Sequence, residues 1–202
     1  MRIAVLGASG KTGHTLVQQA LERGHHVVAL VRTPSHFTVV DERVDVRQVD
    51  VLASPTLPDA ADADVAISAI GVGKGDAPGA LIAGARALAA TPVRTIWLGA
   101  LGSGSSTGAG GAIYQTIMRM FVGKELAEKG EADQIALDSG ATVFHAPDVT
   151  NGSLSPGRHI VSLADFARPF LPPRISRASL AALMLDEAEN NSHAGTLVVP
   201  LA

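Results

Sequence analysis

The chain has 202 residues, and its 16 Lys and Arg against 19 Asp and Glu give a formal net charge of −3. That length fits one domain with a single core, and no apolar run approaches the roughly 18 to 20 residues that a membrane-spanning helix needs. Cysteine is absent, which excludes disulfides, thiolate metal sites and a cysteine nucleophile. The apolar run Ile3–Leu6 is too short for a secretory signal. We therefore expect a cytoplasmic protein.

The composition also limits the partners of the chain. Basic residues are scattered without a run, and the aromatic residues are five Phe, one Trp and one Tyr. Nucleic-acid binding normally needs a basic patch or a set of stacking aromatic side chains. We therefore expect no nucleic-acid partner and no membrane partner. The expected partner is a small molecule or a cofactor, and the chain is expected to be a monomer or a homodimer.

Short apolar runs alternate with longer helical patterns along the chain. This alternation predicts an α/β fold of the Rossmann type, in which a doubly wound, mostly parallel sheet carries helices on both faces. We expect strands at 2–6, 26–31, 65–70, 95–98 and 142–145, a strand marked by Val44, Val46 and Val49, and an edge strand at 196–199. We expect helices at 12–23, at 78–90 with Pro78 in the first turn, from Tyr114 or Met118 to Ser139 with a break near Gly123, and from the cap Ser176 through Glu189, with a helical turn or two at 58–63.

Three glycines, Gly7, Gly10 and Gly13, follow the first strand and open the first helix at a regular spacing. In a dinucleotide-binding turn, one glycine allows a tight turn, one lets the backbone approach a pyrophosphate, and one lets helix and strand pack closely. The helix N-terminus then presents N–H groups and the positive end of its dipole to the phosphates. The pattern predicts that a dinucleotide binds at Gly7, Ser9, Gly10, Lys11, Thr12 and Gly13.

Two other interpretations of this turn remain open. The triplet Gly10-Lys11-Thr12 is like the end of a nucleoside-triphosphate-binding loop, but that loop needs a glycine where this chain has Val5. A tight strand–helix turn without any ligand is the other alternative. The strand before the turn and the helix after it favour dinucleotide binding over both.

The end of the second strand indicates which dinucleotide binds. Proteins that prefer NAD usually carry Asp or Glu there, to bind the ribose 2′-hydroxyl. This chain has Arg32 instead, which is placed to pair with a 2′-phosphate and to stack on adenine. Thr33 and Ser35 add hydroxyl donors. We therefore expect NADP(H) in preference to NAD(H); the alternative is that Arg32 is a solvated arginine at a strand end.

Several stretches together carry a resemblance to known proteins. They are the glycine turn, Val31-Arg32-Thr33-Pro34, Val49-Asp50-Val51-Leu52, Ser68-Ala69-Ile70-Gly71, Ser139-Gly140-Ala141-Thr142-Val143 with Pro147, and Ile175-Ser176-Arg177-Ala178-Ser179-Leu180-Ala181. The chain resembles the atypical short-chain dehydrogenases/reductases, in particular the NAD(P)H-binding proteins similar to biliverdin reductase B, the NADH-flavin reductases and the NmrA-like proteins. The resemblance implies one NAD(P)-binding domain over residues 1–202, with a substrate pocket formed by C-terminal loops.

The resemblance also implies roles for individual residues. Asp50 and Val51 are expected to contact adenine, and Ala69, Ile70, Gly71 and Val72 to line the ribose and nicotinamide side of the cofactor. Asp50 has a second interpretation, in which it caps the turn that follows it, and the two roles are compatible. Glycine and serine dominate residues 99–111, a composition typical of a mobile loop. We expect this loop to form a lid together with residues 73–75 and 149–157.

The chain departs from the family where acid–base chemistry is expected. Short-chain dehydrogenases typically use Tyr-x-x-x-Lys, in which the lysine lowers the tyrosine pKa for proton transfer. The one tyrosine here is Tyr114, and residue 118 is Met. Lys129 falls where the lysine of the family's K-x-x-A-E stretch stands, and the serine after the fifth strand is displaced to Ser103. Lys129 and Ser103 are therefore the candidate catalytic residues; a solvated helix lysine is the alternative for Lys129.

Other catalytic constellations are weak. Ser103, His145 and Asp148 have the residue types of a hydrolase triad, but no Gly-x-Ser-x-Gly elbow lies between a strand and a helix. The family's Arg-Pro becomes His145-Ala146-Pro147 here, and we interpret His145 as a core histidine with satisfied hydrogen bonds. No metal site is expected, because His25-His26 lacks partner ligands nearby.

These observations favour an NADPH-dependent oxidoreductase that transfers a hydride to a flavin, a quinone or a similar conjugated acceptor. Such a transfer needs little help from a protein acid, because solvent can deliver the proton, and this fits the missing tyrosine–lysine pair. A non-catalytic, NADP-sensing regulatory protein of the NmrA-like type is the alternative. An epimerase or dehydratase on the same fold would more often need the acid–base pair that is missing.

Overall fold

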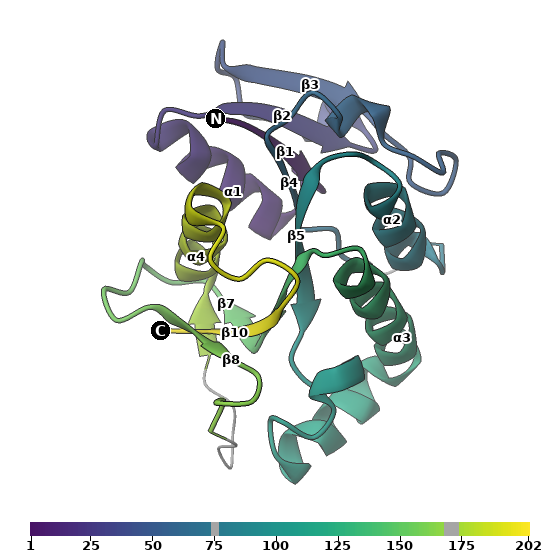
Figure 1. Cartoon of the computed structure of the whole chain (residues 1–202), viewed down its shortest axis with the longest axis vertical. Helices are drawn as coiled ribbons and strands as arrows, with labels where there is room; N and C mark the ends of the chain where they lie inside the picture. The colour runs from purple at the N-terminus through teal and green to yellow at the C-terminus, as the bar shows by residue number, and fades with distance from the viewer. Residues whose placement is uncertain (74–76, 168–173) are drawn as a thin grey trace.

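The computed structural model describes residues 1–73, 77–167 and 174–202, without the side chains of 117–119 and 121–124. Figure 1 shows a central sheet with helices on both of its faces. The sheet has eight strands in the order β3-β2-β1-β4-β5-β6-β10-β8. These strands are β1 (Arg2–Leu6), β2 (His26–Val31), β3 (Val44–Gln48), β4 (Val65–Ser68), β5 (Arg94–Ala100), β6 (Thr142–Ala146), β8 (His159–Ser162) and β10 (Leu197–Leu201). A second, two-stranded sheet pairs β7 (Asp148–Thr150) with β9 (Arg174–Ser176) in parallel.

The helices lie in two layers. They are α1 (Lys11–Glu22), α2 (Ala80–Ala89), α3 (Ala112–Asp138) and α4 (Arg177–Asn190), with short 3-10 turns at Pro34–His36, Pro58–Ala60 and Gly104–Ser106. α1 and α4 cover one face of the sheet, and α2 and α3 cover the other (Figure 1). Of the helices in the described residues, none has both the length and the apolar character needed to cross a membrane.

The strand pairing confirms the predicted fold class, a Rossmann-type α/β fold. The first seven strands in the sheet order, from β3 at one edge to β10, pair in parallel. The last strand, β8, pairs antiparallel with β10. The chain starts in the interior of the sheet, winds outward to β3, and then crosses back over β1 to β4. In open α/β sheets, such a reversal leaves a crevice at the carboxyl ends of the two strands, where ligands bind. The topology therefore places a crevice beyond β1 and β4.

Two cores lie on the two faces of the sheet, because successive side chains of a strand point to opposite faces. In β1, Ile3 and Val5 belong to the core beneath α1 and α4. Ala4 and Leu6 belong to the core beneath α2 and α3. A strand buried on both faces appears in the sequence as a continuous apolar run, which is the signal that predicted β1.

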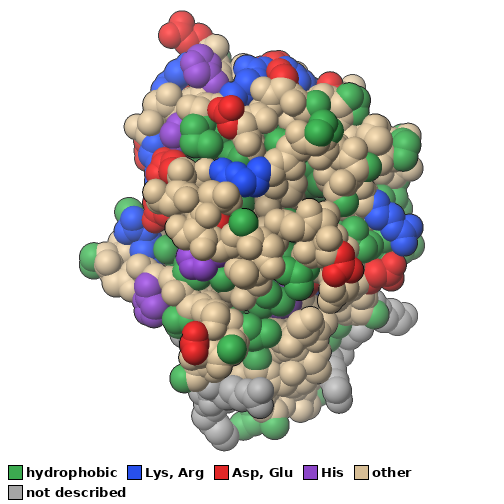
Figure 2. Space-filling view, viewed as in Figure 1, with side chains coloured by type: hydrophobic (Ala, Val, Ile, Leu, Met, Phe, Trp, Pro, Cys, Tyr) green, Lys and Arg blue, Asp and Glu red, His purple; other side chains and the backbone are tan. Residues whose placement is uncertain are grey.

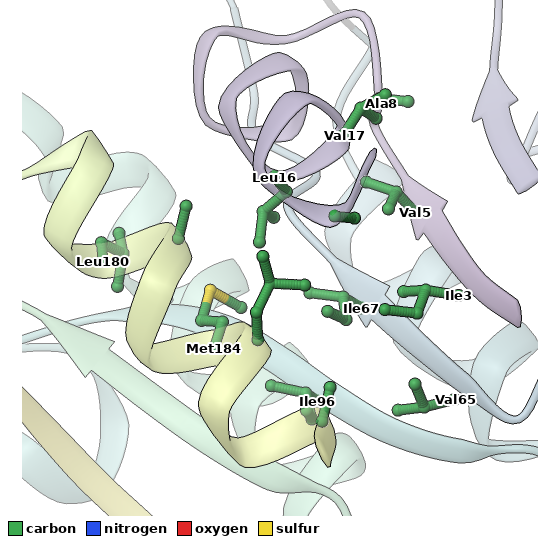
Figure 3. Close-up of a cluster of buried hydrophobic side chains, with 14 of the residues drawn as sticks. Ile3, Val5, Ala8, Leu16, Val17, Val65, Ile67, Ile96, Leu180 and Met184 are labelled. Atoms are coloured by element: carbon green, nitrogen blue, oxygen red, sulfur yellow. The ribbon is translucent and has the colours of Figure 1, made fainter. Parts of the chain in front are cut away.

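The core beneath α1 and α4 fixes α1 against the sheet. Figure 3 shows side chains from both helices pointing toward the strands. Leu16 of α1, Met184 of α4 and Ile67 of β4 meet in this core, and each is 0% exposed. Fully burying a leucine side chain contributes about 1.5–3 kcal/mol. This packing therefore also fixes the turn from which α1 begins.

The predicted cap of α4 is confirmed, and a glycine ends α1. The Ser176 hydroxyl accepts a hydrogen bond from the Ser179 backbone N–H (3.0 Å) and caps α4. Gly24, after the end of α1, has a φ of 81°, a left-handed conformation that glycine adopts without strain.

The prediction that residues 196–199 form an edge strand is wrong. β10 pairs with β6 on one side and with β8 on the other, so β8 lies at the edge. β8 consists of four residues that are half-buried or exposed. Such a strand lacks the apolar run that marks the interior strands, which is why the sequence did not indicate it.

Two helix starts also differ from the prediction. α2 begins at Ala80 and not at Pro78, because Gly79 has a φ of 91° and places Pro78 in the preceding turn. α3 begins at Ala112, and it continues through Gly123 without the predicted break. Tertiary packing against α2 supports α3, and the Leu81 N–H donates to the Glu128 carboxylate (3.0 Å) between the two helices.

The prediction that residues 99–111 form a mobile loop is not supported. Residues 99 and 100 belong to β5, and Ser103 and Ser106 are each 1% exposed. Gly102 and Gly108 have φ values of 95° and 79°, so these glycines serve tight turns. Of the other lid segments, residues 74 and 75 lie outside the described residues.

We expect the Leu16→Ala variant to lower the free energy of unfolding by about 2–5 kcal/mol, because it leaves a cavity between α1, α4 and the sheet. Urea unfolding followed by circular dichroism measures this change. Gln18→Ala, at an exposed position of the same helix, is the control and should stay within about 0.5 kcal/mol of the parent. An equal effect of the two substitutions would contradict the packing described for α1.

Candidate functional site

A cavity of about 740 Å³, the larger cavity below, lies at the carboxyl ends of β1, β2 and β4. It is lined by Leu6, Gly7, Ser9, Gly10, Lys11, Thr12, Leu30, Arg32, Thr33, His36, Val49, Asp50, Val51, Leu52, Ala69, Ile70, Gly71, Val72, Gly73, Ala80 and Arg177. This position is the crevice that the strand order predicts. All residues proposed from the sequence as cofactor-binding line the larger cavity except Gly13 and the hydroxyl donor Ser35.

Backbone conformation explains Gly7 of the turn, and close packing explains Gly13. Gly7 has a φ of 80°, a conformation that favours glycine. Its N–H donates to the Leu30 carbonyl of β2 (3.1 Å), and the Gly10 N–H donates to the Gly7 carbonyl (2.9 Å). A Cβ at Gly13 would lie 2.1 Å from the Gly7 carbonyl oxygen. Gly13 is therefore buried behind the turn and lets α1 start directly against it.

The N-terminus of α1 fits an anionic group. No side chain caps the helix at Gly10, and its first turn carries no acidic residue. The His14 N–H donates to the Gly10 carbonyl (2.8 Å), whereas the N–H groups of Lys11, Thr12 and Gly13 precede the first bond of the helix. These groups and the positive end of the helix dipole favour a phosphate at this position. The residues present thus fit the pyrophosphate of a dinucleotide.

The end of β2 supplies basic and hydroxyl groups to the larger cavity. Arg32 and Thr33 follow the strand, and His36 lies one 3-10 turn later. Arg32 is exposed, and its carbonyl accepts a hydrogen bond from the Gln48 side chain of β3 (3.2 Å). No Asp or Glu occupies the end of this strand, where an NAD-preferring protein carries one.

Asp50 and residues 69–72 form opposite parts of the cavity wall. The Asp50 carboxylate accepts a hydrogen bond from the Leu52 N–H (3.0 Å), which confirms the interpretation that Asp50 caps its turn. Residues 69–72 follow β4 directly and close the crevice from the other side. A Cβ at Gly7 would lie 3.0 Å from the Ile70 backbone. The glycine turn therefore packs closely against residues 69–72.

Two basic residues of the larger cavity, His36 and Arg177, were not predicted from the sequence. His36 reaches it because the 3-10 turn Pro34–His36 brings the chain back after β2. Arg177 is the first residue of α4, far from the glycine turn in the sequence. Its guanidinium donates to the Asn151 side chain and to the Val149 carbonyl. The Ile-Ser-Arg stretch indicated the start of the helix but not that the arginine lines the larger cavity.

The two candidate catalytic residues do not lie in this cavity. Ser103 is 1% exposed, and its hydroxyl lies 2.7 Å from both the Ala100 carbonyl and an Asp133 carboxylate oxygen. Lys129 is half-buried on α3 and lines neither described cavity. The structure therefore separates both residues from the residues proposed to bind the cofactor.

A buried polar network surrounds Asp133, which is 5% exposed. Its Oδ1 accepts a hydrogen bond from the Trp97 indole N–H (2.9 Å), and its Oδ2 accepts one from the Ser103 hydroxyl (2.7 Å). Nε2 of the fully buried His145 lies 3.0 Å from the same Oδ2, without the alignment of a hydrogen bond. A Cβ at Gly99 would lie 2.5 Å from Oδ1, so glycine is required where the carboxylate meets β5.

The network contains a carboxylate–imidazole–hydroxyl chain, but not the one considered from the sequence. Asp148 of β7 is exposed and pairs with Arg174 (3.2 Å). The hydroxyl nearest to His145 Nδ1 belongs to Ser106 (2.6 Å), and it also accepts the Gly102 N–H (2.8 Å). Ser106 is 1% exposed and lines neither described cavity. This geometry does not present a nucleophile to a substrate.

Tyr114 stands near the N-terminus of α3 and is half-buried. Burial raises the pKa of its phenol, and the negative charge of Asp148 raises it further. The phenol therefore stays protonated at neutral pH. No lysine follows Tyr114 at the spacing that would lower this pKa.

The fold, the glycine turn and the crevice define a Rossmann-type dinucleotide-binding protein. The sequence pattern of the NAD(P)H-binding family matches residues 7–191, and the chain belongs to that family. Over 75 residues it is 36% identical to YwnB, an uncharacterized protein of Bacillus subtilis (strain 168). This stretch covers 37% of the chain and 34% of YwnB, so the match reaches only about a third of that relative.

Solved structures show the same fold over the whole chain. A Streptococcus pneumoniae protein provisionally named as an NADH-flavin reductase is 20% identical, with a TM-score of 0.75 and coverage of 100% of this chain and 99% of that one. The oxidoreductase ylbE of Lactococcus lactis is 15% identical, with a TM-score of 0.79 and coverage of 99% and 90%. ChuY of Escherichia coli O157:H7, named an anaerobillin reductase, is 18% identical, with a TM-score of 0.73 and coverage of 100% and 97%.

We expect Asp133→Ala to lower the free energy of unfolding by about 1–3 kcal/mol, because it leaves the Trp97 indole N–H buried without its acceptor, whereas the Ser103 hydroxyl keeps the Ala100 carbonyl. Urea unfolding measures the loss. Asp138→Ala, at an exposed position near the end of α3, is the matched control and should change stability by about 0.5 kcal/mol or less. An unchanged free energy of unfolding in Asp133→Ala would show that the network contributes little to stability.

Proposed function

We propose that the chain is an NADPH-dependent oxidoreductase that transfers a hydride to a flavin, a quinone or a similar conjugated acceptor. The observation that carries this proposal is the N-terminus of α1, which has no side-chain cap and lies in the crevice beyond β1 and β4, with Arg32 at the end of β2. Family membership supports the nicotinamide cofactor. The preference for NADP(H) rests on Arg32 and on the missing acid at that strand end.

Each wall of the larger cavity has a role in this proposal. Ser9, Gly10, Lys11 and Thr12 hold the pyrophosphate; Arg32 and Thr33 hold the 2′-phosphate; Asp50 and Val51 contact adenine; Ala69, Ile70, Gly71 and Val72 line the ribose and nicotinamide side. Gly13 supports the turn from behind. The nicotinamide supplies the hydride when it is bound. The protein binds and orients it at the end of the sheet where the acceptor is to meet it.

The proton balance of the reaction is simple. A hydride carries two electrons and one proton to the acceptor, and one further proton completes its reduction. Ser103 and Lys129 remain predictions as catalytic residues, and neither lines a described cavity. Solvent is therefore the proposed source of the second proton.

The names of the structural neighbours are consistent with a conjugated acceptor. One is provisionally an NADH-flavin reductase, and another is named an anaerobillin reductase. For the present chain we propose a single NAD(P)-binding domain over residues 1–202, with an acceptor pocket formed by C-terminal loops such as 149–157. We further propose a cytoplasmic location and a monomeric or homodimeric state.

We expect the purified protein to oxidise NADPH when a free flavin or a quinone is added, because both accept a hydride without a protein acid. Absorbance at the reduced nicotinamide band measures the rate, and a reaction without protein is the blank. Tight NADP(H) binding without turnover on either class of acceptor would contradict the proposal. That result would favour the second candidate function, a regulatory protein that senses NADP.

One observation favours this second candidate. Tyr114 has no lysine at the required spacing, and the larger cavity contains no tyrosine among its described lining residues. A sensor needs the binding walls but no acid–base pair. The same experiment therefore separates the two functions, because both require dinucleotide binding and only the oxidoreductase requires turnover.

We expect Arg32→Ala to weaken NADPH binding roughly ten- to a hundredfold while the affinity for NADH changes by about twofold or less. The arginine donates charge-assisted hydrogen bonds to the 2′-phosphate, and such bonds contribute about 1.5–3 kcal/mol. Isothermal titration calorimetry with both dinucleotides measures the two affinities. Arg174→Ala removes an exposed arginine that lines neither described cavity and serves as the control. Equal losses for NADPH and NADH would contradict a specific 2′-phosphate contact.

A further inference from the structure

A second cavity of about 550 Å³, the smaller cavity below, adjoins the larger one. It is lined by Ser9, Gly10, Lys11, His14, Thr15, His36, Thr38, Asn151, Gly152, Arg177 and Ala178. Five of these residues, Ser9, Gly10, Lys11, His36 and Arg177, also line the larger cavity. The two cavities therefore meet at the glycine turn, and the smaller one extends from it along α1 and the start of α4.

The smaller cavity is basic. Its titratable lining residues are Lys11, His14, His36 and Arg177, and no Asp or Glu is among the lining residues. Within the described parts of the chain, none of the four forms an ion pair with an acid. The chain as a whole has a net charge of −3, and on the face in Figure 2 acidic and basic side chains are interspersed. A cavity with basic groups only is thus a local exception.

Helix geometry brings these groups together. Lys11, His14 and Thr15 lie on one face of α1, because residues three and four apart on a helix are neighbours. The side chain of Gln19 donates to the Ala178 carbonyl (3.0 Å), so α4 begins beside the second half of α1. The first turns of α1 therefore extend beyond the start of α4, and the smaller cavity lies between these turns and the first residues of α4. The positive end of the α4 dipole adds to the basic side chains there.

We propose that the smaller cavity is a binding subsite for a phosphate monoester. A phosphate monoester carries a charge of about −1.5 to −2 near neutral pH and offers three acceptor oxygens. Four basic side chains around one cavity match the charge of a phosphate monoester better than they match the single charge of a carboxylate ligand. Hydroxyl and amide groups of Ser9, Thr15, Thr38 and Asn151 add donors.

This inference builds on the proposed function, which supplies two sources of a phosphate monoester. One is the terminal phosphate of an acceptor such as flavin mononucleotide, and the other is the ribose 2′-phosphate of NADP. His14, Thr15 and Asn151 line only the smaller cavity, whereas Arg32 lines only the larger one. That division favours the acceptor, because the residue placed for the 2′-phosphate lies outside the smaller cavity.

Dissociation constants of matched ligand pairs test the subsite without requiring turnover. Flavin mononucleotide and riboflavin share one ring and differ by the phosphate, as NADP⁺ and NAD⁺ differ by the 2′-phosphate. Calorimetry measures all four affinities for the parent protein, for His14→Glu and for His159→Glu. His14 lines only the smaller cavity, and His159 is an exposed histidine that lines neither. The control variant therefore makes the same charge change elsewhere.

We expect the parent to bind the phosphorylated member of one pair more tightly, and His14→Glu to weaken that member alone by roughly three- to tenfold. Loss on flavin mononucleotide alone identifies the acceptor as the source, and loss on NADP⁺ alone identifies the dinucleotide. His14→Gln, which removes the basic group without adding charge, replaces His14→Glu if that variant does not fold.

The proposal is overturned if the parent does not distinguish either pair, or if the His14 variants weaken both members of each pair equally. It is also overturned if His159→Glu has the same effect as His14→Glu. Failure of the proposed function gives a different result, since it appears as absent turnover with riboflavin and with flavin mononucleotide while these affinities remain measurable.

Discussion

The close contact between Gly13 and the Gly7 carbonyl is the constraint on which both cavities depend. A Cβ at Gly13 would lie 2.1 Å from that oxygen, so α1 can begin directly on the turn only with glycine there. The Gly7 N–H is held by the Leu30 carbonyl, which ties the turn to β2. Because Leu16 then packs α1 onto the sheet, the direction of the helix N-terminus is fixed. That N-terminus forms part of both cavities.

The part of the fold that could be predicted from the sequence is the part with strong local signals. Interior parallel strands such as β1 and β2 are buried on both faces and appear as apolar runs, and Ser176 marks α4 by a cap that needs only its own helix. β8 is short and partly exposed, so it has no such run. The start of α2 depends on the φ of Gly79, which a residue type permits but does not dictate.

The candidate site divides in the same way. The glycine turn and Arg32 lie within one strand–turn–helix–strand unit, so their spacing in the sequence places them near each other. Arg177 reaches the same cavity only because α4 packs beside α1, and no local pattern encodes that contact. Asp133 likewise meets Ser103 and His145 only when α3 folds against β5 and β6. Residues joined by tertiary packing were therefore the ones that the sequence did not reveal.

The separation of these two groups of residues has a chemical consequence. Asp133, Ser103 and His145 have the functional groups of acid–base catalysis, but they are buried and occupied with one another or with the indole of Trp97. Apart from Asp50, the polar groups of the cavity walls are mainly basic side chains, hydroxyls and the N–H groups of a helix start, which bind anions. Such groups hold and orient an anionic, phosphorylated ligand. The cavity walls therefore favour binding and orientation, and in the proposed function the reactivity is that of the nicotinamide.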